Sequence, residues 1–188
     1  MHGCRCHSNL RTEVAFGLHI HTKQETELAT SLRIRRVSLD EMAKGADHLE
    51  KKFSRTLKNT RYKKELEAGI LCDLGEEWQS MNILLTGEPF PTGGAASLPV
   101  LGGEHIATME TQTDVLLILK PELVHASAHY LQGIDGNQLA AERKSKLRVA
   151  GGAPDWMIDT LIKHIENLRE FYCGASAIGN AVTKRVYS

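Results

Sequence analysis

The stretch of the chain that most constrains the fold runs from Cys72 to Gly103. Asp73 stands three residues before Glu76, which is the spacing of a capping box at the start of a helix. Apolar residues then repeat at helical spacing, at Trp78, Met81 and Leu85. Gly87 follows at the position where a helix commonly ends in a left-handed residue. The pattern therefore predicts a helix over residues 74–86.

A loop rich in proline and glycine follows this predicted helix. Pro89 and Pro91 prevent the helix from resuming, because proline has no N–H to donate to the preceding turn. The apolar run from Leu98 to Leu101 then stands between small residues on one side and Gly102-Gly103 on the other. We predict a short strand there, near an edge of the sheet, because Pro99 cannot donate to a ladder.

The same stretch resembles the YfbM-like family, small bacterial proteins carried as a domain of unknown function. The resemblance rests on two patterns: Trp78-x-x-x-Asn82-x-Leu84-Leu85-Thr86-Gly87, and Leu98-Pro99-Val100-Leu101-Gly102-Gly103. It extends from about Leu32 to the end of the chain and implies a single domain over residues 31–188. Family members often have histidine where this chain has Gln79 and Asn82, so the resemblance implies no imidazole function at these two positions.

The rest of the chain alternates strand and helix patterns. Alternating apolar and basic residues predict a strand near 32–37, and apolar runs predict strands near 115–119 and 181–187. Apolar stripes at helical spacing predict helices near 38–66, 121–132 and 155–177. We therefore expect an α+β fold, in which a small mixed sheet of about four short strands is flanked by helices.

Composition excludes several classes of function. The 188 residues contain as many Lys and Arg as Asp and Glu, 23 of each, so net charge favours neither nucleic acid nor a membrane surface as a partner. No apolar run of about 18 residues predicts a transmembrane helix, and no early apolar stretch resembles a signal peptide. We expect a cytoplasmic protein whose four cysteines are reduced thiols.

A basic segment offers one alternative. Residues 51–64 contain seven Lys or Arg side chains and no acid, and Tyr62 is available for stacking, which is typical of a surface that follows phosphates. Glu50, Glu65 and Glu67 flank the segment, and cations suit the end of a helix. We favour a solvated helix face over nucleic-acid binding.

Two groups of residues have metal-ligand character. Near the N-terminus lie Cys4, Cys6 and His7, but the Cys-x-Cys spacing is tighter than that of structural zinc sites, and no second cysteine pair follows. We interpret residues 1–30 as a poorly ordered extension outside the domain. His125 and His129 have the i, i+4 spacing of metal ligands, yet they lie opposite the apolar stripe of their helix. We interpret them as surface histidines, and we expect no cofactor.

Two classes of function remain open. The first is a non-enzymatic protein-binding module that uses a groove beside the Trp78 helix. Its candidate binding residues are Trp78, Asn82, Thr86, Gly87, Glu88, Gly102 and Gly103. Because relatives of such families include immunity-type and accessory proteins, the resemblance implies a protein partner. The alternative is a small enzyme with Glu88, Glu104 or His105 as acid or base, or with Cys72 as a nucleophile.

Overall fold

The computed structural model describes residues 31–56, 59–90, 93–106, 115–147 and 154–187. These residues form five strands, seven helices and one short 3-10 turn. In chain order they are β1 (Ser31–Val37), α1 (Leu39–Met42), α2 (Ala46–Thr56), α3 (Asn59–Glu67), β2 (Leu71–Gly75), α4 (Trp78–Thr86), η1 (Ala95–Ser97), β3 (Glu104–Ile106), β4 (Val115–Leu119), α5 (Pro121–Gly133), α6 (Gly136–Arg143), α7 (Asp155–Ala177) and β5 (Ala181–Tyr187). None of these helices combines the length and the apolar character that crossing a membrane requires.

The strands form one sheet in the order β2-β1-β5-β4-β3, and every neighbouring pair is antiparallel. The predicted strands near 32–37, 115–119 and 181–187 are confirmed as β1, β4 and β5. The sheet has five strands where about four were predicted, because β2 and β3 were missed. The predicted mixed pairing is wrong, because no parallel pair occurs among the described residues. The predicted strand over 98–101 is also wrong, because Leu98 has helical dihedral angles and closes the turn η1.

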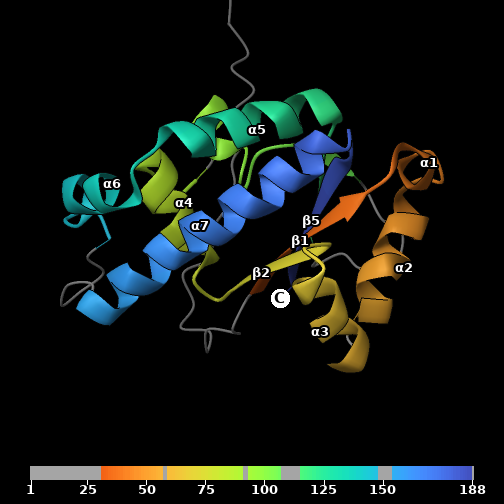
Figure 1. Cartoon of the computed structure of the whole chain (residues 1–188), viewed down its shortest axis with the longest axis horizontal. Helices are drawn as coiled ribbons and strands as arrows, with labels where there is room; N and C mark the ends of the chain where they lie inside the picture. The colour runs from red at the N-terminus through yellow and green to blue at the C-terminus, as the bar shows by residue number, and fades with distance from the viewer. Residues whose placement is uncertain (1–30, 57–58, 91–92, 107–114, 148–153, 188) are drawn as a thin grey trace, which may run out of the picture.

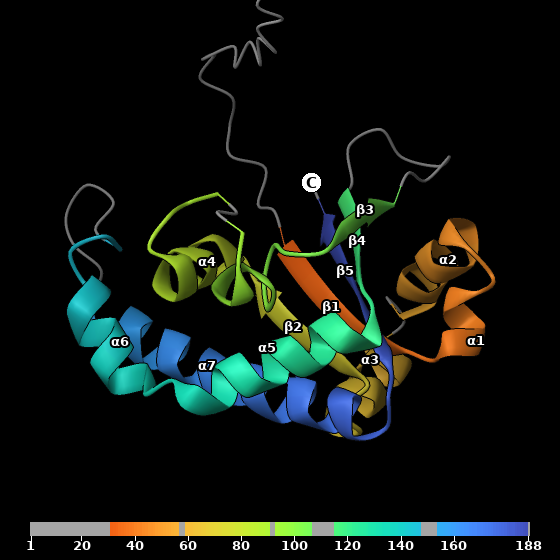
Figure 2. The ribbon, with the colours of Figure 1, turned by 90° about the horizontal axis from the view of Figure 1, so that it is seen from above.

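Helices cover both faces of the sheet (Figures 1 and 2). Helices α4, α5 and α7 lie over one face, where Ile34 and Val182 pack in a large aliphatic core. Helices α2 and α3 lie over the opposite face, where Leu49 and Phe53 of α2 pack against Ile118 of β4 in a smaller cluster. The predicted α+β architecture is thus confirmed as helices on both sides of a central sheet.

The helix boundaries follow local chemistry. The predicted helix over 38–66 is divided into α1, α2 and α3, and Gly45, with a φ of 84°, lies between the first two. Ser38 forms a capping box with Glu41 at the start of α1. The helices predicted near 121–132 and 155–177 are confirmed as α5 and α7, whereas α6 was not predicted.

Helix α4 begins later than predicted. Asp73 does not cap it, because Asp73 lies in β2, where its carboxylate accepts from Arg33, Tyr62 and the Gly75 backbone N–H. The helix begins at Trp78 and ends at Thr86, and its C-cap residue Gly87 is left-handed as predicted, with a φ of 82°.

Candidate functional site

A turn fastened by two polar side chains follows helix α4. Asn82 is buried, and its Nδ2 donates to the carbonyl oxygens of Glu88 at 2.9 Å and Pro89 at 3.3 Å. The Thr86 hydroxyl lies 2.8 Å from the carbonyl oxygens of both Asn82 and Glu88, and it accepts from the Glu88 N–H at 3.0 Å. The Asn–Thr–Gly pattern that carries the family resemblance therefore fixes the path of the chain from Gly87 to Pro89.

Two cations from the region of α6 complete the end of α4. Arg143 donates to the Leu84 carbonyl at 2.7 Å, and Lys146 donates to the Gly87 carbonyl at 3.0 Å. Positive charge at this end of a helix complements the helix dipole and satisfies carbonyls that have no partner within the helix. Lys146 also lies 3.6 Å from the carboxylate of Glu88.

The fastened turn presents Phe90 to solvent. The Phe90 side chain is 71% exposed, while Met81, Leu84 and Leu85 on the same helix are buried. Trp78, one helical turn from Asn82, is half-buried and packs against the aliphatic core. Of the predicted binding residues, Asn82, Thr86 and Gly87 thus hold or form this turn, Trp78 belongs to the core side of the helix, and Glu88 lies exposed on the turn.

The segment from Leu98 to Gly103 lies across the aliphatic face as a strap. Lys184 of β5 is fully buried, and its Nζ donates to the carbonyls of Leu98 and Gly102. Tyr172 of α7 donates to the Pro99 carbonyl at 2.9 Å. A Cβ at Gly102 would lie 2.6 Å from Cα of Leu98, and one at Gly103 would lie 2.7 Å from the Ile118 carbonyl oxygen. Close backbone packing therefore accounts for both glycines.

Burial lowers the pKa of Lys184. Because the amine has no solvent around it, its pKa is lowered well below the ordinary value for lysine. Its two acceptors are both backbone carbonyls of the strap. The apolar run of the strap is thus anchored by a lysine more than eighty residues later in the chain.

The predicted catalytic residues do not converge. Glu88 pairs with Lys146, whereas Glu104 pairs with Lys120 at 3.2 Å. His105 is exposed on β3. Cys72 is buried, and burial raises the pKa of its thiol to about 12, so it is protonated and weakly nucleophilic at neutral pH. No hydrogen bond or ion pair within the described part of the chain joins any two of these four residues.

The metal-ligand candidates are likewise separate. Glu122, His125 and His129 are exposed on α5, as their position opposite the apolar stripe predicted, and His125 Nδ1 lies 3.1 Å from the Ser176 hydroxyl. No group of three metal-ligating side chains occurs among the residues with described positions. Cys4, Cys6 and His7, with the rest of residues 1–30, lie outside them.

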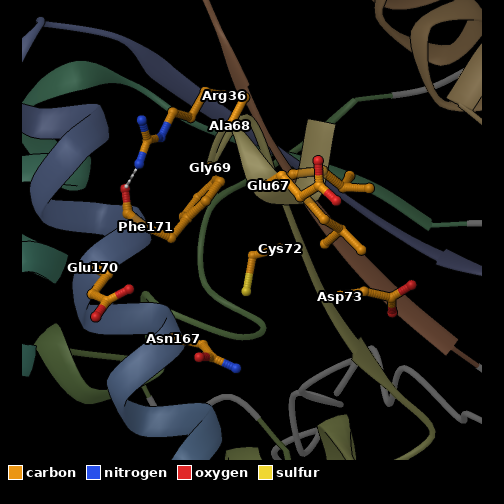
Figure 3. Close-up of a pocket in the computed structure, with 11 residues that line it drawn as sticks. Arg36, Glu67, Ala68, Gly69, Cys72, Asp73, Asn167, Glu170 and Phe171 are labelled. Atoms are coloured by element: carbon orange, nitrogen blue, oxygen red, sulfur yellow. Dashed lines mark hydrogen bonds between the residues drawn. The ribbon is translucent and has the colours of Figure 1, made fainter. Parts of the chain in front are cut away.

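Sequence reasoning missed a cleft of about 420 Å³ between β2, the end of α3 and helix α7 (Figure 3). Its apolar lining includes Leu71, Cys72 and Phe171. Its polar lining consists of Arg36, Glu67, Asp73, Asn167 and Glu170. The alternation of apolar Cys72 and Leu74 with polar Asp73 was the sequence signal for a strand here. It was overlooked because the Asp73–Glu76 spacing was interpreted as the start of a helix.

Arg36 closes one end of this cleft. Its guanidinium lies over the Phe171 ring, 5.0 Å from the centroid, and donates to the Phe171 carbonyl at 2.9 Å (Figure 3). A Cβ at Gly174 would come within 2.9 Å of Arg36 Cζ, so glycine gives the guanidinium its space beside α7. Burial lowers the pKa of Arg36.

The charge of Asp73, by contrast, is balanced by partners within the protein. Its carboxylate accepts from Arg33 at 3.0 Å and from the Tyr62 hydroxyl at 2.6 Å. Burial, together with the hydrogen bond to Asp73, raises the pKa of Tyr62 to about 12. The charges of the cleft that remain open to solvent therefore come from Arg36, Glu67 and Glu170.

Comparison with solved structures shows the same fold in one protein of unknown function, YfbM from Escherichia coli. The two chains are 15% identical, the match covers 84% of this chain and 99% of the other, and the TM-score is 0.56. No curated protein matches this sequence. The family described as "Domain of unknown function (DUF1877)" matches residues 28–184. Since the match spans most of the chain, this protein belongs to that family.

Proposed function

We propose that this protein is a non-enzymatic, cytoplasmic binding module, of accessory or immunity type, that holds a partner protein at the turn Glu88–Phe90. The observation that carries the proposal is the contrast between the exposed aromatic ring of Phe90 and the buried amide that fixes the backbone beside it. Hydrogen bonds to Asn82 and Thr86 already order the turn in the free protein. A partner that binds there therefore loses little binding free energy to ordering the turn.

The chemistry of the turn suits a protein surface. Aromatic side chains that enter a pocket of the partner dominate the energy of many interfaces, and charged groups at the rim orient the two proteins. Phe90 provides the aromatic group, and Glu88 with Lys146 provides one charge of each sign next to it.

The enzyme hypothesis gains no comparable support from the described residues. An active site needs titratable groups that converge on one position of the substrate. Glu88 and Glu104 are bound to different lysines, and neither they nor His105 line the cleft beside β2.

Photo-crosslinking in a lysate of the native host tests the proposal. The full chain carrying Phe90→p-benzoylphenylalanine should give a discrete crosslinked product, identified by mass spectrometry and suppressed by excess unlabelled wild-type protein. The same photoreactive residue at Ile178, which is 65% exposed, serves as the matched control and should not give that product. Equal products from both positions would contradict the proposal.

Affinity of the identified partner gives the second measurement. Phe90→Ala should weaken binding by about tenfold or more, because an aromatic anchor is lost. Trp156→Ala removes another aromatic side chain, 66% exposed at the start of α7, and should leave affinity unchanged. Unchanged affinity in Phe90→Ala would reject the turn as the binding element.

A further inference from the structure

The cleft beside β2 runs along an edge of the sheet. Strand β2 is the first in the order β2-β1-β5-β4-β3, and β1 is its sole strand neighbour among the described residues. Three consecutive residues of β2, Leu71 to Asp73, line the cleft. The opposite wall comes from α7 and one end from the α3–β2 turn, so the cleft lies beside the edge strand of the sheet (Figure 3).

The floor of the cleft suits the side chain of an extended segment. Cys72 is 6% exposed, its sulfur points into the space between β2 and α7, and the hydrogen bonds described for these residues include none to it. Leu71 and Phe171 add further apolar surface. A volume of about 420 Å³ is at the lower end of the range for ligand sites.

The charge of the cleft selects the partner. Glu67 lies at the α3 end of the cleft and Glu170 on its α7 wall, and neither takes part in an ion pair described for this part of the protein. Asp73 is already paired with Arg33, and Arg36 is engaged with the Phe171 carbonyl at one end. Two carboxylates against one guanidinium leave the cleft with one excess negative charge.

We propose that this cleft receives an extended segment of a partner protein that carries a lysine or arginine, added as a further strand at the free edge of β2. Main-chain hydrogen bonds to β2 supply sequence-independent affinity, and the basic side chain lies between Glu67 and Glu170 and supplies selectivity. Its aliphatic stem lies on the floor formed by Cys72 and Phe171, as lysine stems commonly do on apolar surface. This site is separate from the Phe90 turn.

Fluorescence anisotropy with a defined probe tests the inference on the full chain. The probe is a fluorescein-labelled heptapeptide of alternating threonine and lysine, TKTKTKT. It should bind saturably, and the acidic analogue TETETET should not. A TKTKTKT peptide with alternate amide nitrogens methylated on the edge that would face β2 should lose binding, because it cannot form the ladder.

Two charge-matched variants locate the site. The double variant Glu67→Gln/Glu170→Gln should bind the probe about fivefold more weakly, since two partly exposed ion pairs are lost. The control Glu122→Gln/Glu142→Gln removes two exposed carboxylates elsewhere and should bind as the wild type does. All four substitutions are at exposed positions, and unchanged thermal melts should show that both variants fold.

Three results would overturn the inference: no saturable binding of TKTKTKT, equal weakening in both double variants, or full binding of the methylated peptide. The Phe90→Ala variant separates the two proposals. It should retain binding of the probe even if it loses the partner that crosslinks at position 90.

Discussion

The two faces of the sheet are buried by different chemistry. Toward α5 and α7, the sheet presents aliphatic side chains such as Leu32, Ile34 and Val182. Toward α2 and α3, the same strands present Arg33, Arg35 and Arg185. Successive residues of a strand point to opposite faces of the sheet, so one strand contributes aliphatic side chains to one face and charged side chains to the other.

The ionic face is organised as pairs. Arg35 NH2 donates to Glu65 at 2.9 Å, Arg33 is 3.0 Å from Asp73, and the third arginine of this face, Arg185, is 3.2 Å from Glu50. Arg33 and Arg185 are directly opposite each other on β1 and β5, and the ring of Tyr187 lies 4.9 Å from each guanidinium carbon. Burial of these arginines depends on their partners, whereas burial of the aliphatic side chains on the other face depends on shape. Removing one partner of a buried ion pair should therefore lower the free energy of unfolding more than removing a methyl group from an aliphatic side chain.

The largest effect is expected for Glu65→Ala. It leaves Arg35, 5% exposed, without the carboxylate that accepts from both of its terminal nitrogens. We expect a loss of about 4 kcal/mol in the free energy of unfolding, measured by urea denaturation. The double variant Arg35→Met/Glu65→Leu should recover most of this loss, because no unpaired charge remains buried. A double variant as unstable as the single one would contradict the ionic interpretation.

Acid should weaken this face in the wild type. Hydrogen bonds from Arg35, together with Arg61, lower the pKa of Glu65 to about 2 from an ordinary value of 4.5. The stability from this depressed pKa is complete above the ordinary value and is lost as the pH falls from there toward 2. The Arg35→Met/Glu65→Leu variant should lose less stability over this interval, and identical profiles would reject Glu65 as the group responsible.

The next effect is expected on the aliphatic face. Leu168→Ala removes a fully buried side chain from α7 and should cost about 3 kcal/mol through lost transfer energy and the cavity that remains. Because no charge is involved, the loss should be the same at low and high salt in urea denaturation. A loss that shrinks strongly with salt would show that the two faces are not distinct.

Lys184→Met should have an intermediate effect. It removes the donor of the Leu98 and Gly102 carbonyls but also removes a desolvated amine, and we expect a loss of about 2 kcal/mol. The lowered pKa means that the unfolded chain binds the proton more tightly, so wild-type stability should rise with pH from the lowered value toward 10.5. The difference between wild type and variant should grow over that interval. A constant difference would mean that Lys184 is charged in the folded protein.

The smallest effect is expected for Glu104→Gln. Its ion pair with Lys120 is exposed, with side-chain accessibilities of 66% and 52%, so solvent screens it. We expect a change below about 0.5 kcal/mol in thermal denaturation. A larger loss would mean that Glu104 has a structural role beyond this surface pair.

Sequence patterns predicted the aliphatic half of the fold better than the ionic half. The stripes of α5 and α7 and the glycine cap of α4 arise from contacts within one helix or from burial of an unbroken apolar face. The burial of Arg35 was not predicted, because its partner Glu65 is thirty residues away and β1 reads as a strand with one solvated face.

The candidate sites follow the same rule. The fastened turn after α4 uses residues six and seven positions apart, and sequence reasoning reached it. The cleft joins Arg36 to Phe171, which are separated by 135 positions, and local patterns carry no information about such a pairing. The strap was predicted as a strand because its apolar run was read locally. The residue that holds its carbonyls, Lys184, lies far away in the sequence, in β5.

The place of β5 has a consequence for how the chain assembles. The strand that comes last of the five in sequence is the middle one of the sheet, between β1 and β4. Until it arrives, the β1–β2 pair and the β3–β4 pair have no sheet neighbour in common, so each is a separate two-stranded pair of marginal stability. Refolding should therefore be slow for a chain of this helix content, with β5 amides and those of its neighbours becoming protected from hydrogen exchange in a single concerted step.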